Sequence, residues 1–268
     1  MPETDRIFSG SIPALYDRYM RPMIFEPYAA DLARRLADFS SGDLLEIAAG
    51  TGVLTNALRL SLPKTVTIVA TDLNQPMVDF AAARSDARVT WRQADALHLP
   101  FADSAFDVVV CQFGAMFFPD KVAAYRETLR VLRPGGRFVF NVWDRIEDND
   151  FGRAVSEGVA AIFPHDPPQF IARTPHGYHD KDRVKSELHA AGFSQIQVET
   201  VSLLSQAPSC YDPAIGFCQG SPLRSELEAR GPNCVAEATE AAAAMVRTQF
   251  GDGPIRGKMQ AHVIIAAR

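Results

Sequence analysis

The stretch Leu44-Leu45-Glu46-Ile47-Ala48-Ala49-Gly50-Thr51-Gly52 decides the fold of this chain. An apolar run carries one acidic residue and breaks into a turn of small residues, and helix-forming apolar residues follow from Val53. This order predicts a buried strand, a tight turn and a helix, the opening of a nucleotide-binding α/β unit. Small residues let the backbone approach a ligand, and the free N–H groups at the helix start face that ligand.

Glu46 adds a chemical reason for a ligand at this turn. Glycines after a first strand also serve packing alone, so the turn by itself leaves a purely structural interpretation open. A carboxylate inside a buried strand is costly unless something pairs with it. A bound cation would pair with it, such as the ammonium of an amino-acid moiety, directly or through water.

Two further acidic residues follow predicted strands. Asp72 closes a β-branched run that starts at Thr65, at the position where dinucleotide-binding folds hold ribose hydroxyls. The alternative for Asp72 is a cap for the helix that starts near Pro76. Asp95 follows a short strand at 89–93 and can accept a hydrogen bond from an adenine amino group, or it can close a turn.

The motifs form an ordered series: Glu46-x-Ala-x-Gly50-Thr51-Gly52, Asp72, Asp95-Ala96, Phe106-Asp107 and Leu132-Arg133-Pro134-Gly135-Gly136. The series covers roughly residues 40 to 145 and resembles the class I S-adenosylmethionine (SAM)-dependent methyltransferases, in the methyltransferase type 11 group that includes quinone C-methyltransferases. The sequence departs from the pattern at Ala48, where many members have glycine.

This resemblance implies that SAM is the cofactor and that the chain is an enzyme. It would transfer a methyl group by direct displacement to a small, partly apolar molecule. Tyr16 and Tyr19 belong to a segment that lies over the cofactor in related enzymes, with interhelical packing as the alternative. The cofactor-binding residues that the resemblance implies are Tyr16, Tyr19, Glu46, Ala48, Gly50, Gly52, Asp72, Leu73, Met77, Asp95, Ala96, Gln112 and Phe113.

The rest of the sequence predicts an α/β architecture. Strands are expected near 43–47, 65–71, 89–93, 106–111 and 136–142, joined by helices near 53–61, 76–84 and 121–132. Their alternation predicts a Rossmann-like, mainly parallel sheet with helices on both faces. The resemblance adds strands near 193–204 and 261–268, the last antiparallel, to give seven. Two helices are expected between residues 11 and 39, the second from about Tyr28 to Phe39.

We expect a single methyltransferase domain over residues 1–268. Its core is about 40–145 plus the two late strands. Two insertions remain, about 145–192 and about 205–260, and the second contains an alanine-rich helix over 235–250. Both insertions leave the sheet where its ligand crevice is expected, so they are interpreted as a helical cap.

No catalytic residue is assigned from the sequence. Methyl transfer can proceed through orientation and desolvation alone when the acceptor is electron-rich, whereas an oxygen or carbon acid needs a general base. His176 and His179, which flank Tyr178, are candidate bases, with loop packing or solvent exposure as the alternative. The stripe Phe113, Met116, Phe117 and Phe118 indicates either an apolar wall beside the methyl donor or part of the core.

Composition narrows the partners. The net charge is −5 and no run of Lys and Arg forms a basic patch, which disfavours nucleic acid and stable membrane association. The four cysteines show no C-x-x-C pair, and no metal-ligand cluster is evident. The N-terminus lacks the apolar core of a signal peptide, so a cytoplasmic location is expected. Oligomeric state is open between monomer and homodimer.

Two alternatives stay open at this point. The first is a SAM-binding sensor or scaffold without transferase activity, because no base can be assigned. The second is a nicotinamide-dependent dehydrogenase, which shares the glycine turn. The dehydrogenase fingerprint places a third glycine where this chain has Thr55, and that disfavours it.

Overall fold

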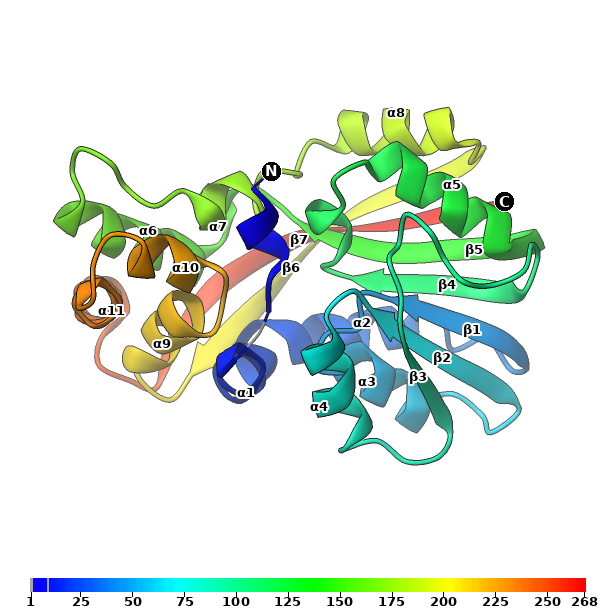
Figure 1. The fold of residues 1–268 in the computed structure, drawn as a ribbon, viewed down its shortest axis with the longest axis horizontal. Coiled ribbons are helices and arrows are strands. Elements are labelled where there is room, and N and C mark those ends of the chain that lie inside the picture. Colours follow the sequence, from blue (N-terminus) through cyan, green and yellow to red (C-terminus); the bar gives the residue numbers. More distant parts are fainter. Residues whose placement is uncertain (1, 9) are drawn as a thin grey trace. The chain divides into compact units, whose positions relative to one another are not determined.

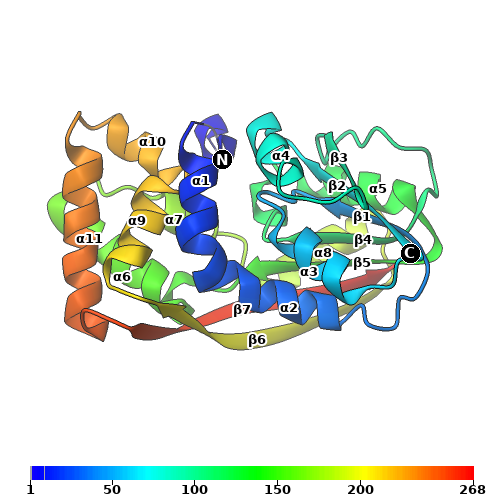
Figure 2. The same cartoon turned by 90° about the horizontal axis from the view of Figure 1, so that it is seen from below.

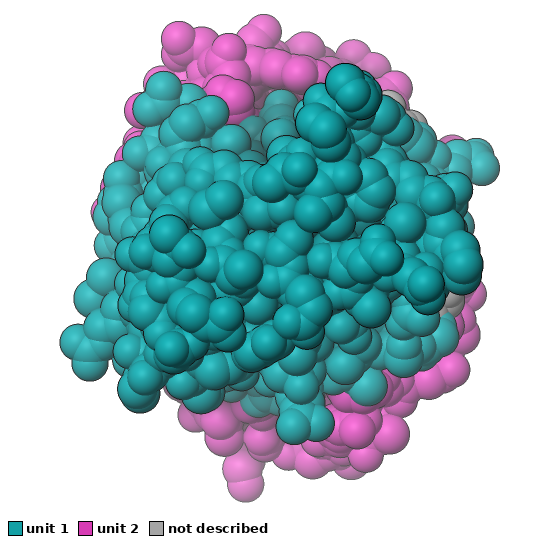
Figure 3. Space-filling view, turned by 90° about the vertical axis from the view of Figure 1, so that its left-hand side faces the viewer, with its two compact units in different colours: residues 1–27, 143–177, 202–260 teal, residues 28–142, 178–201, 261–268 magenta. Residues whose placement is uncertain are grey.

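A computed structural model describes residues 2–8 and 10–268. The chain divides into two compact units, coloured separately in Figure 3. The first, here called the helical unit, contains residues 1–27, 143–177 and 202–260. The second, here called the core unit, contains residues 28–142, 178–201 and 261–268. The core unit carries the glycine turn and both candidate acidic residues that follow it.

The sheet has seven strands in the order β3-β2-β1-β4-β5-β7-β6 (Figure 1). The pairs β1–β2, β2–β3, β1–β4 and β4–β5 are parallel, and β7 is antiparallel, which confirms the predicted fold class. The chain reverses direction across the sheet at β1, which lies between β2 and β4, and ligands of such sheets bind at this switch point. The strands are β1 Gly42–Ile47, β2 Val66–Asp72, β3 Val89–Gln93, β4 Phe106–Gln112, β5 Leu132–Trp143, β6 Gln195–Ala207 and β7 Ile255–Ala267.

The central strands read as continuous apolar runs because helices cover both faces. Leu45, Val109 and Phe138 are in register and fully buried, and Phe138 lies beside Tyr125 of α5 (Lys121–Val131). The next residue along β1, Glu46, contacts Thr55 of α3 (Val53–Ser61). Successive side chains point to opposite faces of a strand, so α3 and α5 cover opposite faces.

Helix predictions in the core unit are confirmed to within about two residues: α3 Val53–Ser61, α4 Gln75–Ala82 and α5 Lys121–Val131. One strand begins earlier than expected. β5 starts at Leu132, and its register on β4 shifts between Phe106 and Val108. Pro134-Gly135-Gly136 is therefore an irregularity inside the strand. A Cβ on Gly136 would lie 2.8 Å from the carbonyl oxygen of Asp107, so only glycine fits there.

The N-terminal region differs from prediction. Instead of two helices between 11 and 39, one helical run extends from Ile12 to Arg34, as α1 (Ile12–Leu15), a π-helical segment (Tyr16–Phe25) and α2 (Glu26–Arg34). Pro22 lies inside the π-helical segment. Proline has no N–H to donate, and the wider π turn accommodates this gap without ending the helix.

The helical unit is built around α11 (Cys234–Phe250), the alanine-rich helix, which packs on α6 (Asp150–Ile162) and on α9 (Tyr211–Gln219) (Figure 2). A Cβ on Gly158 of α6 would lie 2.7 Å from the carbonyl oxygen of Ala241. The small residues on both helices thus permit their close approach. The unit also contains the short helices α7 (Phe170–Arg173) and α10 (Leu223–Glu228).

The segment between β5 and β6 contributes to both compact units. Residues 143–177 belong to the helical unit, and residues 178–201 belong to the core unit. There α8 (Lys181–Ala191) packs against α5, because Tyr178 enters the core and its hydroxyl lies 3.1 Å from that of Tyr125. The single-domain interpretation, and the placement of the insertions as a cap, stay predictions.

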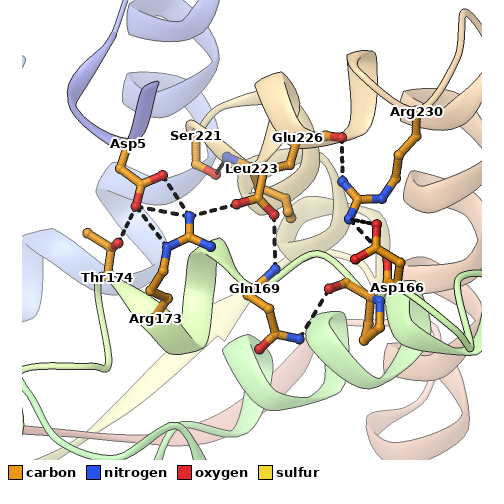
Figure 4. A network of polar contacts seen from close by, with 10 residues as sticks. Asp5, Asp166, Gln169, Arg173, Thr174, Ser221, Leu223, Glu226 and Arg230 are labelled. Atoms are coloured by element: carbon orange, nitrogen blue, oxygen red, sulfur yellow. Dashed lines mark hydrogen bonds and ion pairs between the residues drawn. The ribbon is translucent and has the colours of Figure 1, made fainter. Parts of the chain in front are cut away.

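A polar network closes the helical unit around Asp5 (Figure 4). Asp5 is almost completely buried and accepts two charge-assisted hydrogen bonds from Arg173 Nη2, at 2.8 and 3.0 Å. Thr174 donates to the same carboxylate. Arg173 also pairs with Glu226 of α10 at 2.6 Å. Every oxygen of this buried carboxylate has a donor, so the N-terminal turn is fixed within its unit.

Candidate cofactor site

The turn after β1 adopts a backbone that ordinary residues avoid. Three of its five residues are left-handed, with φ of 56° at Ala48, 57° at Gly50 and 83° at Gly52. A Cβ on Gly50 would meet nothing within 4 Å, so the backbone there faces open space. Gly52 caps α3, and a Cβ on it would lie 2.9 Å from the ring of Trp91. The first glycine leaves room for a ligand, and the second packs the helix onto the sheet.

Ala48 is the departure from the family pattern, and its backbone explains why glycine is common there. A residue with a Cβ in the left-handed region is strained by about 1–2 kcal/mol. Gly114 compensates in part, because a Cβ on it would lie 2.5 Å from the Ala48 methyl group. The glycine after β4 therefore makes room for the methyl group that this sequence carries after β1.

Glu46 is buried with no cationic partner. It is 1% exposed, and Thr55 Oγ1 donates to its Oε2 at 2.5 Å. No ion pair among the described residues includes it. Burial raises the pKa of this carboxyl to about 8, with Asp72 adding a smaller repulsion and the Thr55 hydrogen bond opposing. A cation bound beside Glu46 would favour its charged form.

Asp72 fixes the same turn from β2. Its Oδ2 accepts the N–H of Gly50 at 2.8 Å, and its Oδ1 accepts the N–H of Asn74 at 2.8 Å. Burial raises the pKa of Asp72, and these backbone hydrogen bonds oppose the shift. The N-cap position of α4 is Asn74, so the capping alternative for Asp72 does not account for its place. Its role toward ribose stays a prediction.

The remaining candidates near β2 and β3 differ in exposure. Asp95 Oδ1 accepts the N–H of Leu97 at 3.0 Å. This bond closes the turn that the sequence analysis gave as the alternative to adenine binding. Ala96, the next residue, is buried. Leu73 is 39% exposed at the end of β2, an unusual place for leucine that suits contact with a ligand. Met77 is buried in α4.

The end of β4 is strained as well. Phe113 has a φ of 51°, which is rare for a bulky residue and is found where surrounding structure imposes it. Its N–H donates to Asn141 Oδ1 at 2.9 Å, and its ring packs edge-on against Tyr28 of α2 at 5.2 Å. Gln112 beside it is half-buried. The core unit thus brings Gln112 and Phe113 to the same edge of the sheet as the β1 turn, since parallel strands end together.

Two predicted residues lie in the helical unit. Tyr16 stacks on Phe25 at 4.7 Å and meets Phe8 edge-on at 6.0 Å, and the guanidinium of Arg18 lies 5.1 Å from the ring centre of Tyr19. These contacts lie within the segment Tyr16–Phe25 or involve Phe8, so they are not the interhelical packing considered as the alternative. A contact with the cofactor stays a prediction for both tyrosines.

The two candidate bases fall in different units. His176 is buried in the helical unit, with Nδ1 2.7 Å from the carbonyl oxygen of Asp144. A carbonyl only accepts, so Nδ1 carries the proton and Nε2 is the basic nitrogen of the neutral ring. A Cβ on Gly152 of α6 would lie 3.4 Å from that Nε2. His179 is half-buried in the core unit. A role as general base stays a prediction for each histidine.

Sequence reasoning missed Thr55 and Asn141. Thr55 was considered only as the residue that replaces the third glycine of the dehydrogenase fingerprint. In the structure its hydroxyl donates a hydrogen bond to Glu46. Asn141 interrupts the buried run Phe138–Val142, and a polar residue inside an apolar strand is the same signal that singled out Glu46. That signal was present in the sequence at position 141.

Within the chain outside positions 1 and 9, no group of three or more His, Cys, Asp or Glu side chains could hold a metal ion. The search of the same residues for helices finds none with the length and hydropathy needed to cross a membrane.

Residues 45–140 match the family described as methyltransferase domain. A ubiquinone/menaquinone biosynthesis C-methyltransferase from Saccharophagus degradans is 28% identical over 177 residues, which are 61% of this chain and 71% of that protein. A demethylmenaquinone methyltransferase from Thermus thermophilus is 42% identical over 99 residues, 36% of this chain and 44% of that protein.

A solved structure has the same fold. The YcgJ protein from Bacillus subtilis superposes with a TM-score of 0.58 at 21% identity, covering 90% of this chain and 98% of its own. Residues 45–140 are thus a methyltransferase domain, and these likenesses, with the motif series and the seven-stranded sheet, support a class I SAM-dependent methyltransferase. SAM is its cofactor. Nothing in the comparisons supports a dehydrogenase or a SAM-binding protein without activity.

Proposed function

We propose that the chain methylates a small, partly apolar molecule, with the cofactor held at the carboxyl ends of β1, β2 and β4 in the core unit. The observation that carries this is Glu46, a buried carboxylate that the chain itself leaves without a cation. The ammonium group of the methionine moiety has the charge to pair with it. The left-handed turn at Gly50 leaves space for the methionine end to reach this carboxylate.

Each acidic residue takes a different part of the cofactor. Glu46 would hold the ammonium, Asp72 the ribose hydroxyls, and Asp95 the adenine amino group. Asp72 Oδ1 accepts the backbone N–H of Asn74 and, at 3.4 Å, its side-chain amide. Oδ2 accepts the N–H of Gly50, and its second lone pair can accept a ribose hydroxyl. Leu73 and Met77 would supply apolar contacts.

When bound, SAM supplies an electrophilic methyl group on sulfur. The work of this chain is to orient the acceptor and exclude water, which can provide most of the rate. No described histidine has a geometry that demands a catalytic role. An acceptor that is already electron-rich fits this arrangement, and His176 Nε2 and His179 are the bases to examine if it is not.

The chemistry of the acceptor is supported from two sides. Phe113, Met116 and Phe118 are buried after β4 and give this end of the sheet an apolar lining. The relatives are named for ubiquinone and menaquinone biosynthesis and for methylation of demethylmenaquinone. We therefore propose a small acceptor with an apolar body. A cytoplasmic location and the absence of nucleic acid as a partner stay predictions.

The direct test measures binding of SAM and of NAD⁺ to the purified protein by calorimetry. SAM is expected to bind and NAD⁺ is not. Absence of SAM binding at millimolar concentration would overturn the proposal. Turnover of methyl-labelled SAM against a panel of phenols, hydroquinones and amines then separates an active transferase from a protein that only binds the cofactor.

A further inference from the structure

Asn141, near the carboxyl end of β5, has an unusual side chain. It is fully buried, and its Oδ1 accepts the N–H of Phe113 at 2.9 Å. This bond fixes the orientation of the amide, because only the oxygen can accept. Its Nδ2 then carries two N–H donors that have no hydrogen-bond partner in the part of the chain that the structure describes.

A second buried asparagine shows what a structural amide looks like in the same protein. Asn149 donates from Nδ2 to the carbonyl oxygens of Arg145 at 2.9 Å and Gln260 at 3.2 Å. Its Oδ1 accepts the N–H of Gln260 at 3.0 Å. Buried donors without partners cost folding free energy and are rare for that reason. The unpaired amide of Asn141 therefore points to a partner that is not part of the chain.

The sheet order places Asn141 on β5, on the opposite side of β1 from Asp72 and Asp95. It is the register partner of Gln112, and alternation puts both on the face that carries Glu46 and Val110, which are themselves in register. Asp72 and Asp95 lie beyond β1 on the other side, after β2 and β3. Neighbouring strands are about 4.8 Å apart, so β5 lies about 14 Å from β2.

A cofactor held by Asp72 at β2 and by Glu46 at β1 would extend along the strand ends toward β4. β5 is the next strand beyond. We propose, on the basis of the function proposed above, that Asn141 binds the methyl acceptor. Its Nδ2 donates a hydrogen bond to a carbonyl or ionised hydroxyl oxygen of the acceptor, while its Oδ1 holds Phe113 in its strained conformation.

This role narrows the class of substrate to apolar molecules that carry an oxygen able to accept a hydrogen bond. An ionised hydroxyl conjugated to the reacting atom makes that atom electron-rich, and amide donors stabilise such an anion in a site without water. The absence of an assigned base is then consistent with an acceptor that reacts as its anion. Gln112, the register partner of Asn141, is half-buried. Solvent therefore reaches this edge of the sheet at Gln112.

The test uses two probes of matched shape, 1-tetralone, whose ketone oxygen only accepts hydrogen bonds, and the hydrocarbon tetralin. Binding is measured by calorimetry with the protein saturated with S-adenosylhomocysteine. The wild-type protein is expected to bind the ketone at least about 10-fold more tightly, the usual scale for a buried hydrogen bond. Asn141→Asp keeps an oxygen for Phe113 but removes the donors, and should abolish this preference.

A buried aspartate in the Asn141→Asp variant could be protonated and still donate a hydrogen bond. Asn141→Leu has no donor at any pH and therefore serves as the second variant. Asn149→Asp is the matched control: it should lower the melting temperature and leave the ketone preference intact. Wild-type protein without a ketone preference, or a preference that survives in both Asn141 variants, would overturn the inference. Failure to bind S-adenosylhomocysteine would instead overturn the proposed function itself.

Discussion

Two buried carboxylates, Asp5 in the helical unit and Glu46 in the core unit, contrast in how they are paired. Both are 1% exposed. Asp5 accepts hydrogen bonds from Arg173 and from Thr174 (Figure 4). Glu46 accepts one, from the Thr55 hydroxyl. A buried charge needs a partner. The fold supplies the cation for Asp5, and we propose that a ligand supplies the one for Glu46.

The contrast extends to the surroundings. The backbone near Glu46 is left-handed at Ala48 and Gly50, and the hydroxyl of Thr51 is buried with no partner among the described residues. Strain and unpaired groups collect at functional sites, because only a functional gain offsets their cost. Pairing, rather than burial, therefore distinguishes the structural carboxylate of Asp5 from that of Glu46, which we propose contacts the cofactor.

The largest expected effect is on the paired carboxylate. Arg173→Met leaves the charge of Asp5 buried without its cation, and should lower the free energy of unfolding by about 3 kcal/mol, measured by urea denaturation. Arg173→Lys should recover part of the loss, since it keeps the charge without the two-pronged geometry. SAM affinity should change less than about 2-fold. Weaker SAM binding at unchanged stability would contradict the structural role.

Glu46→Gln should have the opposite effect to Arg173→Met: it should weaken SAM binding and leave the free energy of unfolding intact. It keeps an oxygen for the Thr55 hydroxyl and removes the charge meant for the cofactor, so SAM should bind about 100-fold more weakly, while the free energy of unfolding does not fall. Thr55→Val, which removes the hydrogen bond and keeps the charge, should weaken SAM binding less. If Glu46→Gln binds SAM like wild type, Glu46 does not contact the ammonium.

Asp72→Ala should weaken SAM binding by about 10-fold or more, because a buried hydrogen bond between a hydroxyl and a charged group contributes ~1.5–3 kcal/mol. Asp86 offers a control, since it is an exposed aspartate paired with Arg59 at 2.7 Å. Asp86→Ala should leave SAM affinity unchanged in the same calorimetric assay. Unchanged affinity in Asp72→Ala would show that Asp72 only fixes the turn.

Ala48→Gly tests the strain in the turn. Glycine relieves the left-handed conformation, so the free energy of unfolding should rise by about 1 kcal/mol. Ala49→Gly, at a neighbour without a positive φ, should lower it by a similar amount through lost backbone entropy. Thermal and urea unfolding of both variants measure the difference. Equal destabilisation by the two substitutions would contradict the argument.

Much of this site was accessible from the sequence, because its signals are local. An acid inside an apolar strand marked Glu46, and the strand-turn-helix pattern fixed the place of Gly50 and Gly52. Three features were not accessible in this way. The φ of Phe113 depends on Asn141 of another strand, and the burial of Tyr178 depends on Tyr125. The unbroken N-terminal helix depends on how a π turn accommodates Pro22.

Because the pKa of Glu46 is raised, both the stability of the folded protein and the binding of the cofactor should depend on pH. In the ligand-free folded protein this carboxyl has a pKa of about 8, against 4.5 ordinarily. Between these values the folded protein holds a proton that the unfolded chain has lost. The stability that this group contributes is therefore complete below pH 4.5 and is lost as the pH rises through 8. A bound ammonium favours the charged form, so cofactor binding at neutral pH must expel the proton.

Proton release on SAM binding is accordingly the most direct measurement. Calorimetric titrations at pH 6.5, in two buffers with different ionisation enthalpies, count the protons exchanged. Wild-type protein should release about one proton for each SAM bound, and Glu46→Gln should release none. Binding of SAM to wild-type protein with no proton release would contradict the claim that Glu46 is protonated in the ligand-free protein and becomes charged when it pairs with the ammonium of the cofactor.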